Sequence, residues 1–287
     1  MKKNLAILSV IIAGVFWGTT GLFVNVLSAH GLDSIQISCI RVISSAIFMS
    51  LFILIKDKSL FKIKLKDLPL LILIGAVSIF STSVCYFKAI DAASVSVACV
   101  LMYTAPIFVL IFSVIFFREK ITVKKIIAVI MAVIGCTFVS GIVGSDSIIS
   151  PTGLIFGLMS GVLYASYSII GKFILNKYSP LTMTVYAFIF AAITALFVFD
   201  FKWAGALADQ NNYLFALYPL TGICTSFMPY LLYSLGLKKL EPSVAAVLSS
   251  IEPLVATLVS VFILLEPFSL ISGAGIVIIL ISVIILN

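Results

Sequence analysis

Long apolar segments recur along the whole chain and constrain its fold more than any other feature. We count ten, each within the roughly 17–25 residues that a membrane-spanning helix needs. Their approximate bounds are 5–28, 34–55, 68–87, 92–117, 123–141, 152–174, 180–199, 213–235, 242–265 and 268–287. A helix satisfies its own backbone hydrogen bonds, so it can cross a bilayer that offers no polar partners. The pattern predicts an all-α membrane protein with ten transmembrane helices.

The composition supports a membrane protein and argues against a soluble one. Of the 287 residues, 62% are hydrophobic and only 10% are charged. Soluble domains carry roughly 25% charged residues, and no soluble core could enclose this much apolar surface. We therefore expect a multi-pass integral protein of the cell membrane, with lipid as a partner.

The basic residues predict an orientation. With a cytoplasmic N-terminus, about fifteen lysines and arginines lie in cytoplasmic segments, and only Lys88 and Lys202 lie on the far side. This bias places both the N-terminus and the C-terminus in the cytoplasm. The net charge of +7 then reflects orientation and attraction to anionic lipid. No nucleic-acid partner is expected.

The chain repeats itself at a constant offset of 147 residues. Gly75 aligns with Gly222, Pro106 with Pro253, and Glu119 with Glu266, without gaps. Matches of Pro, Gly and Glu at one offset are stronger evidence than matches among apolar residues. We expect two five-helix repeats, 1–147 and 148–287, in one integrated membrane domain.

An odd number of helices in each repeat makes the second repeat enter the membrane from the opposite side. The result is an inverted repeat, an architecture common among secondary transporters, whose substrates bind near the midplane. Exchange of conformations between the two halves would give alternating access. A symmetric duplication without a transport role remains the alternative.

Several motifs together resemble the EamA-type branch of the drug/metabolite transporter superfamily. They are the stretch Gly14-Val15-Phe16-Trp17-Gly18, Arg41, Pro106 followed by an apolar run to Glu119, and Glu252-Pro253 followed by a run to Glu266. The resemblance covers the whole chain. It implies export or exchange of small metabolites, often amino acids, through a central cavity. The chain departs from many relatives at Leu265, where they have glycine, and at the equivalent Arg118.

Two charged residues lie deep within predicted spans, where charge is costly and therefore informative. Glu252 could couple transport to protons or bind a substrate amine. Alternatively, it could hydrogen-bond locally to Ser249 or Ser250. Arg41 could clamp a carboxylate or act as a gate, or it could extend toward the interface and bond backbone carbonyls. An Arg41–Glu252 ion pair is a further possibility.

The symmetric prolines and the deep aromatic residues complete the candidate site. Pro106 and Pro253 interrupt helical hydrogen bonding and are either paired hinges or static kinks. Four aromatic residues within spans are candidates for a cavity wall, with ordinary helix packing as the alternative; they are Trp17, Tyr103, Tyr164 and Tyr167.

Together these features predict a secondary transporter of small organic metabolites. Amino acids or related amphipathic compounds are the favoured substrates, export is the favoured direction, and proton coupling depends on Glu252. An uncoupled facilitator or exchanger is the alternative. The spans lack a catalytic constellation or clustered metal ligands, and no phosphate-binding loop is present, so we expect no enzyme activity, metal or cofactor. The glycine steps at Gly153, Gly157 and Gly161 suit internal packing or a homodimer face, which leaves a monomer or a homodimer.

Overall fold

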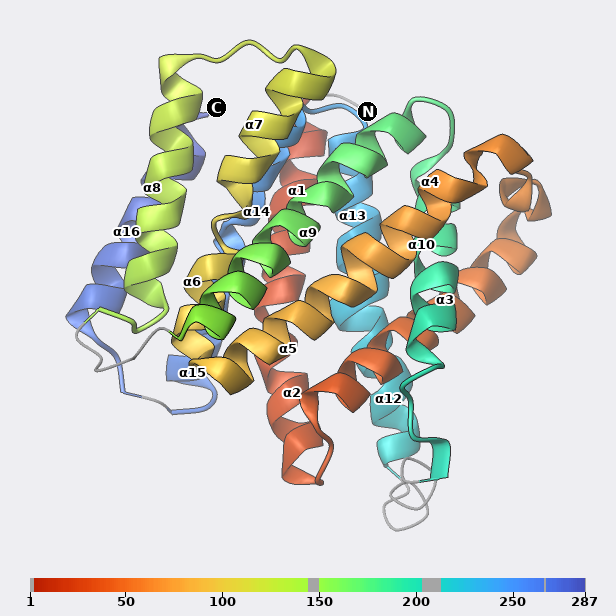
Figure 1. Cartoon of the computed structure of the whole chain (residues 1–287), viewed down its shortest axis with the longest axis horizontal. Helices are drawn as coiled ribbons and strands as arrows, with labels where there is room; N and C mark the ends of the chain where they lie inside the picture. The colour runs from red at the N-terminus through yellow and green to blue at the C-terminus, as the bar shows by residue number, and fades with distance from the viewer. Residues whose placement is uncertain (1–2, 144–149, 203–212, 266, 287) are drawn as a thin grey trace.

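The computed structural model describes residues 3–143, 150–202, 213–265 and 267–286 (Figure 1). These residues form helices and connecting segments without a strand, which confirms the all-α prediction for this part of the chain. Seven helical stretches there are long and apolar enough to cross a membrane; they are Lys3–Ala29, Ser34–Lys56, Leu65–Ala92, Val95–Phe117, Pro151–Leu175, Ala216–Leu237 and Pro242–Phe262. Glu266 and the predicted junction of the two repeats at 147–148 lie outside the described residues.

The elements before the predicted junction follow the expected apolar segments closely. They are α1 (Lys3–Gly18), α2 (Thr20–Ala29), α3 (Ser34–Lys56), the short 3-10 helices η1 (Lys58–Phe61) and η2 (Leu65–Asp67), α4 (Leu68–Ile72), the π-helix η3 (Leu73–Ser81), α5 (Thr82–Ala92), α6 (Val95–Met102), α7 (Ala105–Phe117) and α8 (Val123–Val139). Side-chain oxygens of Asp33, Ser94 and Thr122 cap α3, α6 and α8, which satisfies backbone donors where each helix begins.

The elements after the junction have a similar order. They are α9 (Pro151–Leu175), α10 (Pro180–Ala195), α12 (Leu214–Gly222), the π-helix η4 (Ile223–Phe227), α13 (Met228–Leu237), α14 (Pro242–Ser249), α15 (Ile251–Phe262) and α16 (Leu270–Ile285). Pro151, Pro180 and Pro242 each occupy the first helical position, where a missing backbone N–H costs no hydrogen bond.

Two expected spans are interrupted near their middle. Segment 92–117 divides into α6 and α7 at Tyr103-Thr104, and segment 242–265 divides into α14 and α15 at Ser250. Pro106 and Pro253 follow these breaks, in the first turns of α7 and α15. A proline lacks the N–H needed by the preceding turn and its ring crowds the carbonyl four residues earlier. α6 and α14 accordingly end four residues before Pro106 and Pro253, at Met102 and Ser249.

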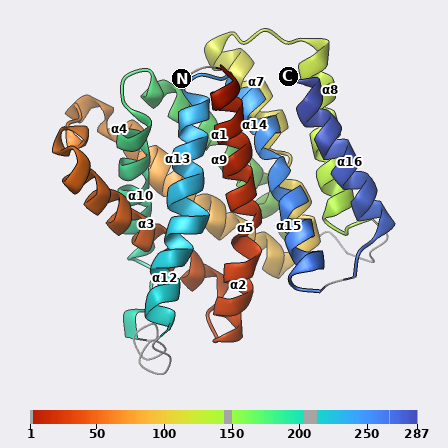
Figure 2. The same ribbon diagram turned by 180° about the vertical axis from the view of Figure 1, so that it is seen from behind.

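The helices pack at short distances through small residues. α1 contacts α13, α5 contacts α9, α3 contacts α10, and α8 lies along α16 at the edge of the molecule (Figures 1 and 2). A Cβ added at Gly135 would lie 2.6 Å from Ile279 Cγ1, and one at Gly275 would lie 2.7 Å from the Gly135 carbonyl oxygen. Lipid supplies no hydrophobic driving force between helices, so such close van der Waals contact stabilises the α8–α16 pair.

The positions of the helix ends define two opposite ends of the molecule. α1 begins and α16 ends beside the α7–α8 link, at the top of Figure 1. α2 ends and α12 begins at the opposite end, as Figure 2 also shows. We call these the link end and the far end.

The apolar faces of α8 and α16 are exposed at Ile130, Ile134, Val277 and Ile284, as expected of helices that face lipid.

Candidate functional site

Trp17 lies at the centre of a buried aromatic cluster between α1, α9 and α13. Its ring centroid is 5.1 Å from that of Tyr230, 5.5 Å from that of Tyr233 and 6.5 Å from that of Tyr164. The Tyr167 ring joins the cluster at 5.0 Å from Tyr230. Most of these contacts are edge-to-face, the arrangement that the ring quadrupoles favour. Three of the four predicted aromatic site residues, Trp17, Tyr164 and Tyr167, therefore come together.

Hydroxyl groups of the cluster have partners within the protein. The Tyr167 hydroxyl lies 3.0 Å from Ser234 Oγ, and the Tyr233 hydroxyl lies 2.6 Å from Ser168 Oγ. A small cavity of about 10 Å³ lies against the cluster, which is space on the order of one water molecule. The cluster is therefore closely packed, with aromatic walls and hydrogen-bonded hydroxyls.

Glu252 lies in the first turn of α15, immediately after the break that separates α15 from α14. The Tyr164 hydroxyl donates to Glu252 Oε2 across 3.5 Å, and the Tyr103 side chain lies nearby. The nearby Ser249 and Ser250 hydroxyls instead donate to the Ala246 carbonyl, at 2.9 and 3.3 Å. The hydrogen-bond partner of the Glu252 carboxylate therefore comes from α9 rather than from its own segment.

Arg41 bonds to the π-helix η4. Its Nε donates to Thr225 Oγ1 at 2.8 Å, and its second guanidinium nitrogen donates to the Thr225 carbonyl at 3.1 Å. Ser45, one helical turn further along α3, donates to the Gly222 carbonyl at 2.8 Å. Among the described residues, Arg41 forms no ion pair with Glu252, although its charge acts on the Glu252 carboxylate. α3 thus fixes the irregular segment of the neighbouring helix.

A larger cavity of about 390 Å³ lies between α6, α8, α15 and α16. It includes residues at the end of α8 and the beginnings of α6 and α16, so it lies toward the far end. Its wall contains hydroxyl and thiol groups as well as apolar groups. The lining residues are Val95, Cys99, Tyr103, Cys136, Val139, Ser140, Gly141, Pro253, Ala256, Thr257, Ser260, Val261, Pro267, Phe268, Ser269 and Ser272.

Tyr103 and Tyr164 each line two neighbouring cavities. Tyr103 lines the large cavity and also a small one that it shares with Pro106, Tyr164 and Ala246. Tyr164 in turn lines the cavity at the Trp17 cluster. The three spaces therefore follow one another from the far end, past Tyr103 and Tyr164, to the aromatic cluster, and Tyr164 is the hydrogen-bond donor to Glu252. We refer to this series as the cavity line.

Sequence reasoning did not assign Tyr230, Tyr233, Thr225 or the hydroxyls of the large cavity to the site. Tyr230 and Tyr233 were visible as tyrosines within a span, where such residues are less usual than at the interfaces. Their contact with Trp17 depends on how α13 is rotated. Thr225 gave no signal, because its part in the site depends on the π-helix that brings it to Arg41.

A multi-pass helical protein with polar and aromatic groups gathered around interior cavities has the construction of a membrane transporter. The comparison with known families agrees. The chain belongs to the EamA-like transporter family, whose model matches residues 4–141 and again residues 151–287. The predicted resemblance is thereby confirmed, and the protein is a multi-pass membrane protein.

Relatives along nearly the full length carry transporter names. An uncharacterized transporter of Archaeoglobus fulgidus is 34% identical, over 91% of this chain and 92% of its own length. The uncharacterized inner membrane transporter YicL of Salmonella typhimurium is 25% identical, over 98% and 94%. One solved crystal structure superposes with a TM-score of 0.82 at 17% identity, covering 99% of this chain and 96% of that one. That last likeness concerns the fold alone.

Proposed function

We propose that this protein is a secondary transporter that moves small organic metabolites across the cytoplasmic membrane by alternating access. Amino acids or related amphipathic compounds are the favoured substrates, and export is the favoured direction. The cavity line carries this proposal, because it leads from a 390 Å³ cavity to a cluster of aromatic rings that includes Tyr164, the hydrogen-bond donor to the interior carboxylate of Glu252. A polar substrate crossing apolar helices needs such a series of hydrogen-bonding groups.

Alternating access rests on ten spans arranged as two inverted repeats, 1–147 and 148–287. Under the offset of 147 residues, the bounds of α6 coincide with those of α14, and the π-helices η3 and η4 overlap. The packing repeats as well: α1 contacts α13 and α15, and α9 contacts α5 and α7. One family model matches each part of the chain. Equivalent packing in both halves is what an exchange of conformations between them requires.

The orientation follows from the positive charges. The link end carries Lys120, Lys124 and Lys125 together with the beginning of α1 and the end of α16. A cytoplasmic link end satisfies the positive-inside rule. The large cavity then opens toward the external side.

Glu252 is the residue to which we assign substrate binding or proton coupling. Its carboxylate faces two phenol groups, and the Trp17 ring packs against one of them, Tyr164. A carboxylate beside aromatic rings suits the amine of an amphipathic substrate, through charge and cation–π attraction. The other site residues would line the path (Trp17, Tyr103, Tyr164, Tyr167), gate it (Arg41) or act as hinges (Pro106, Pro253).

An uncoupled facilitator or exchanger is the second candidate. One observation favours it: the Tyr164 hydroxyl donates to Glu252 Oε2, and a donated hydrogen bond favours the ionised form of a carboxylate. In that case Glu252 binds substrate without carrying a proton. Partners in either case are the small-molecule substrate and lipid.

Proteoliposome transport separates the two candidates. Vesicles with an acidic interior, or with no pH difference, receive a pooled panel of amino acids, amines and nucleosides, and uptake is read by mass spectrometry. We expect accumulation that requires the gradient and is lost in Glu252→Gln. Asp91→Asn, an exposed acid at the end of α5, is the matched control and should transport normally. Gradient-independent exchange that survives Glu252→Gln would favour the facilitator, and no flux through folded protein would contradict transport of this panel.

A further inference from the structure

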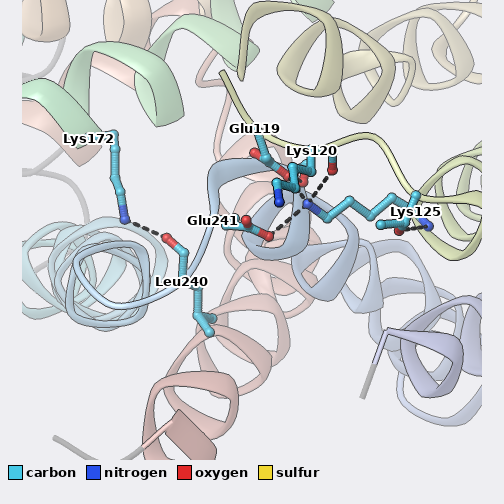
Figure 3. A network of polar contacts seen from close by, with 8 residues as sticks. Glu119, Lys120, Lys125, Lys172, Leu240 and Glu241 are labelled. Carbon is cyan, nitrogen blue, oxygen red and sulfur yellow. Dashed lines mark hydrogen bonds and ion pairs between the residues drawn. The ribbon is translucent and has the colours of Figure 1, made fainter. Parts of the chain in front are cut away.

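A cluster of charged residues, buried except for the exposed Glu241, lies at the link end, away from the cavity line's opening (Figure 3). Lys125 Nζ lies 2.7 Å from Glu119 Oε1, 2.8 Å from Glu241 Oε2 and 3.0 Å from the Lys120 carbonyl oxygen. The Ser243 hydroxyl also donates to Glu119 Oε1. Glu119 is 7% and Lys125 8% exposed. We call these four side chains, Glu119, Lys125, Glu241 and Ser243, the ion cluster.

The ion cluster ties together segments from the two halves of the chain. Glu119 follows α7 and Lys125 lies in the first turn of α8, whereas Glu241 caps the start of α14 and Ser243 lies within it. From α9, Lys172 Nζ donates to the Leu237 carbonyl at 2.8 Å and the Leu240 carbonyl at 2.5 Å. The α13–α14 link is therefore held from both sides, as Figure 3 shows.

The burial of Glu119 and Lys125 makes these two charged side chains depend on their partners. Glu119 Oε2 is buried without a hydrogen-bond partner among the described residues, so Lys125 and Ser243 provide the compensation for this carboxylate through Oε1. Removing one partner of a buried ion pair leaves an uncompensated charge, which is strongly unfavourable. Water can solvate a buried carboxylate that has lost its partner, and water gains access to Glu119 when the segments separate.

The ion cluster also lies directly behind the cavity line. Ala246 is one helical turn beyond Ser243 on α14, and it lines the small cavity together with Tyr103 and Tyr164. A substrate leaving Glu252 toward the link end would meet α7, α14 and the cluster that joins them. At the far end, the line continues into the 390 Å³ cavity instead.

The equivalent positions at the far end do not supply the same charges. Under the offset of 147 residues, Lys125 corresponds to Ser272, Glu241 to Ser94 and Ser243 to Ser96. Ser272 lines the large cavity. The far end thus has serines where the link end has a lysine and a second carboxylate. The equivalent segments are therefore held together by ion pairs at the link end, without the same charges at the far end.

We propose that the ion cluster closes the transport path at the link end, and that its asymmetry makes the link-closed, far-end-open state the resting state of the protein. The inference rests on the proposed transport function. Each cycle then requires Lys125 to separate from Glu241 and Ser243 to separate from Glu119, so that α14 can move away from α7. Glu119, Lys125 and Glu241 are positioning residues, because none of them contacts the cavity.

Cysteine labelling at the two ends tests this closure independently of transport. Native Cys99 lines the large cavity and reports on the far end. An Ala246→Cys substitution reports on the space behind the cluster. Purified protein is treated with a small thiol reagent, and labelling rates at each site are read by peptide mass spectrometry. In Lys125→Gln we expect labelling at position 246 to rise about tenfold, a typical size for coupling between sites, and labelling of Cys99 to fall.

The matched control is Lys124→Gln, which removes the neighbouring exposed lysine and should leave both rates unchanged. Exchanging the charges, with Lys125→Glu and Glu241→Lys together, should restore the original pattern in part. Unchanged rates in folded Lys125→Gln would overturn the proposal. Faster labelling at both ends would also overturn it, since the cluster would then only stabilise the fold. Transport by proteoliposomes is scored separately, so a failed cargo panel does not affect this result.

Discussion

At the scale of single residues, Trp17 makes more contacts with candidate site residues than any charged group does. It contacts three tyrosines from two other helices and is 7% exposed. Tyr164 links it to Glu252, and Glu252 has no equivalent in the first repeat, where Ala105 stands. The aromatic ring at position 17 therefore controls the geometry around the interior carboxylate.

The loss of transport should depend on how much of the Trp17 side chain is removed. Trp17→Ala removes three ring contacts worth about 0.5–1.5 kcal/mol each beyond their buried area, so we expect a lower melting temperature and loss of most transport. Trp17→Phe keeps a ring and should retain both properties in large part. Thermal unfolding in detergent and proteoliposome flux provide the two measurements. Equal activity of Trp17→Ala and wild type would remove Trp17 from the site.

Arg41 has a different role at this scale. Its two hydrogen bonds to Thr225 occupy the guanidinium with a threonine hydroxyl and a backbone carbonyl. The sequence alternatives for Arg41 were a carboxylate clamp or gate, and a bond to backbone carbonyls. The observed contact has the form of the second, and the role of Arg41 in gating remains a proposal.

At the scale of elements, glycines set how closely α1 approaches α15. A Cβ added at Gly18 would lie 2.5 Å from Val255 Cβ and 2.8 Å from the Glu252 carbonyl oxygen, whereas one at Gly21 would meet nothing within 4 Å. Both glycines are near the junction of α1 and α2. Only Gly18 makes a backbone contact that a methyl group would displace.

This pair gives a matched test of helix approach. Gly18→Ala should push α1 away from the turn that holds Glu252, lowering both the melting temperature and transport. Gly21→Ala should be neutral or stabilising by up to about 1 kcal/mol, the usual gain from replacing a helical glycine by alanine. Thermal unfolding and flux of the two variants are compared side by side. Similar behaviour of both would mean that the α1–α15 contact is unimportant.

At the scale of the whole molecule, the link end and the far end must face opposite sides of the membrane. Lys124 at the link end and Asp91 at the end of α5 are both exposed. In intact cells, Asp91→Cys should react with a membrane-impermeant thiol reagent, and Lys124→Cys should react only after permeabilisation. Mass-spectrometric mapping of the labelled peptides measures this. The reverse pattern would invert the proposed orientation and the direction in which the large cavity opens.

Part of the candidate site could be predicted from the sequence alone. Trp17, Tyr164 and Tyr167 were predicted together and lie together, and Tyr103 lines two of the cavities. The serine and threonine hydroxyls of the large cavity were not predicted. A helix that is apolar all round has no amphipathic face to fix its rotation, so the sequence did not indicate which of its few polar groups face inward.

The sequence by itself determined that the chain is helical and lies in a membrane, because segments this apolar can satisfy their backbone only as spanning helices. It also determined the family, through motifs whose order and spacing extend over the whole chain. Only the tertiary structure decided that Arg41 bonds to Thr225 and that Lys125 holds Glu241. These contacts join residues far apart in the chain, and they depend on the distances between packed helices, which local composition does not encode.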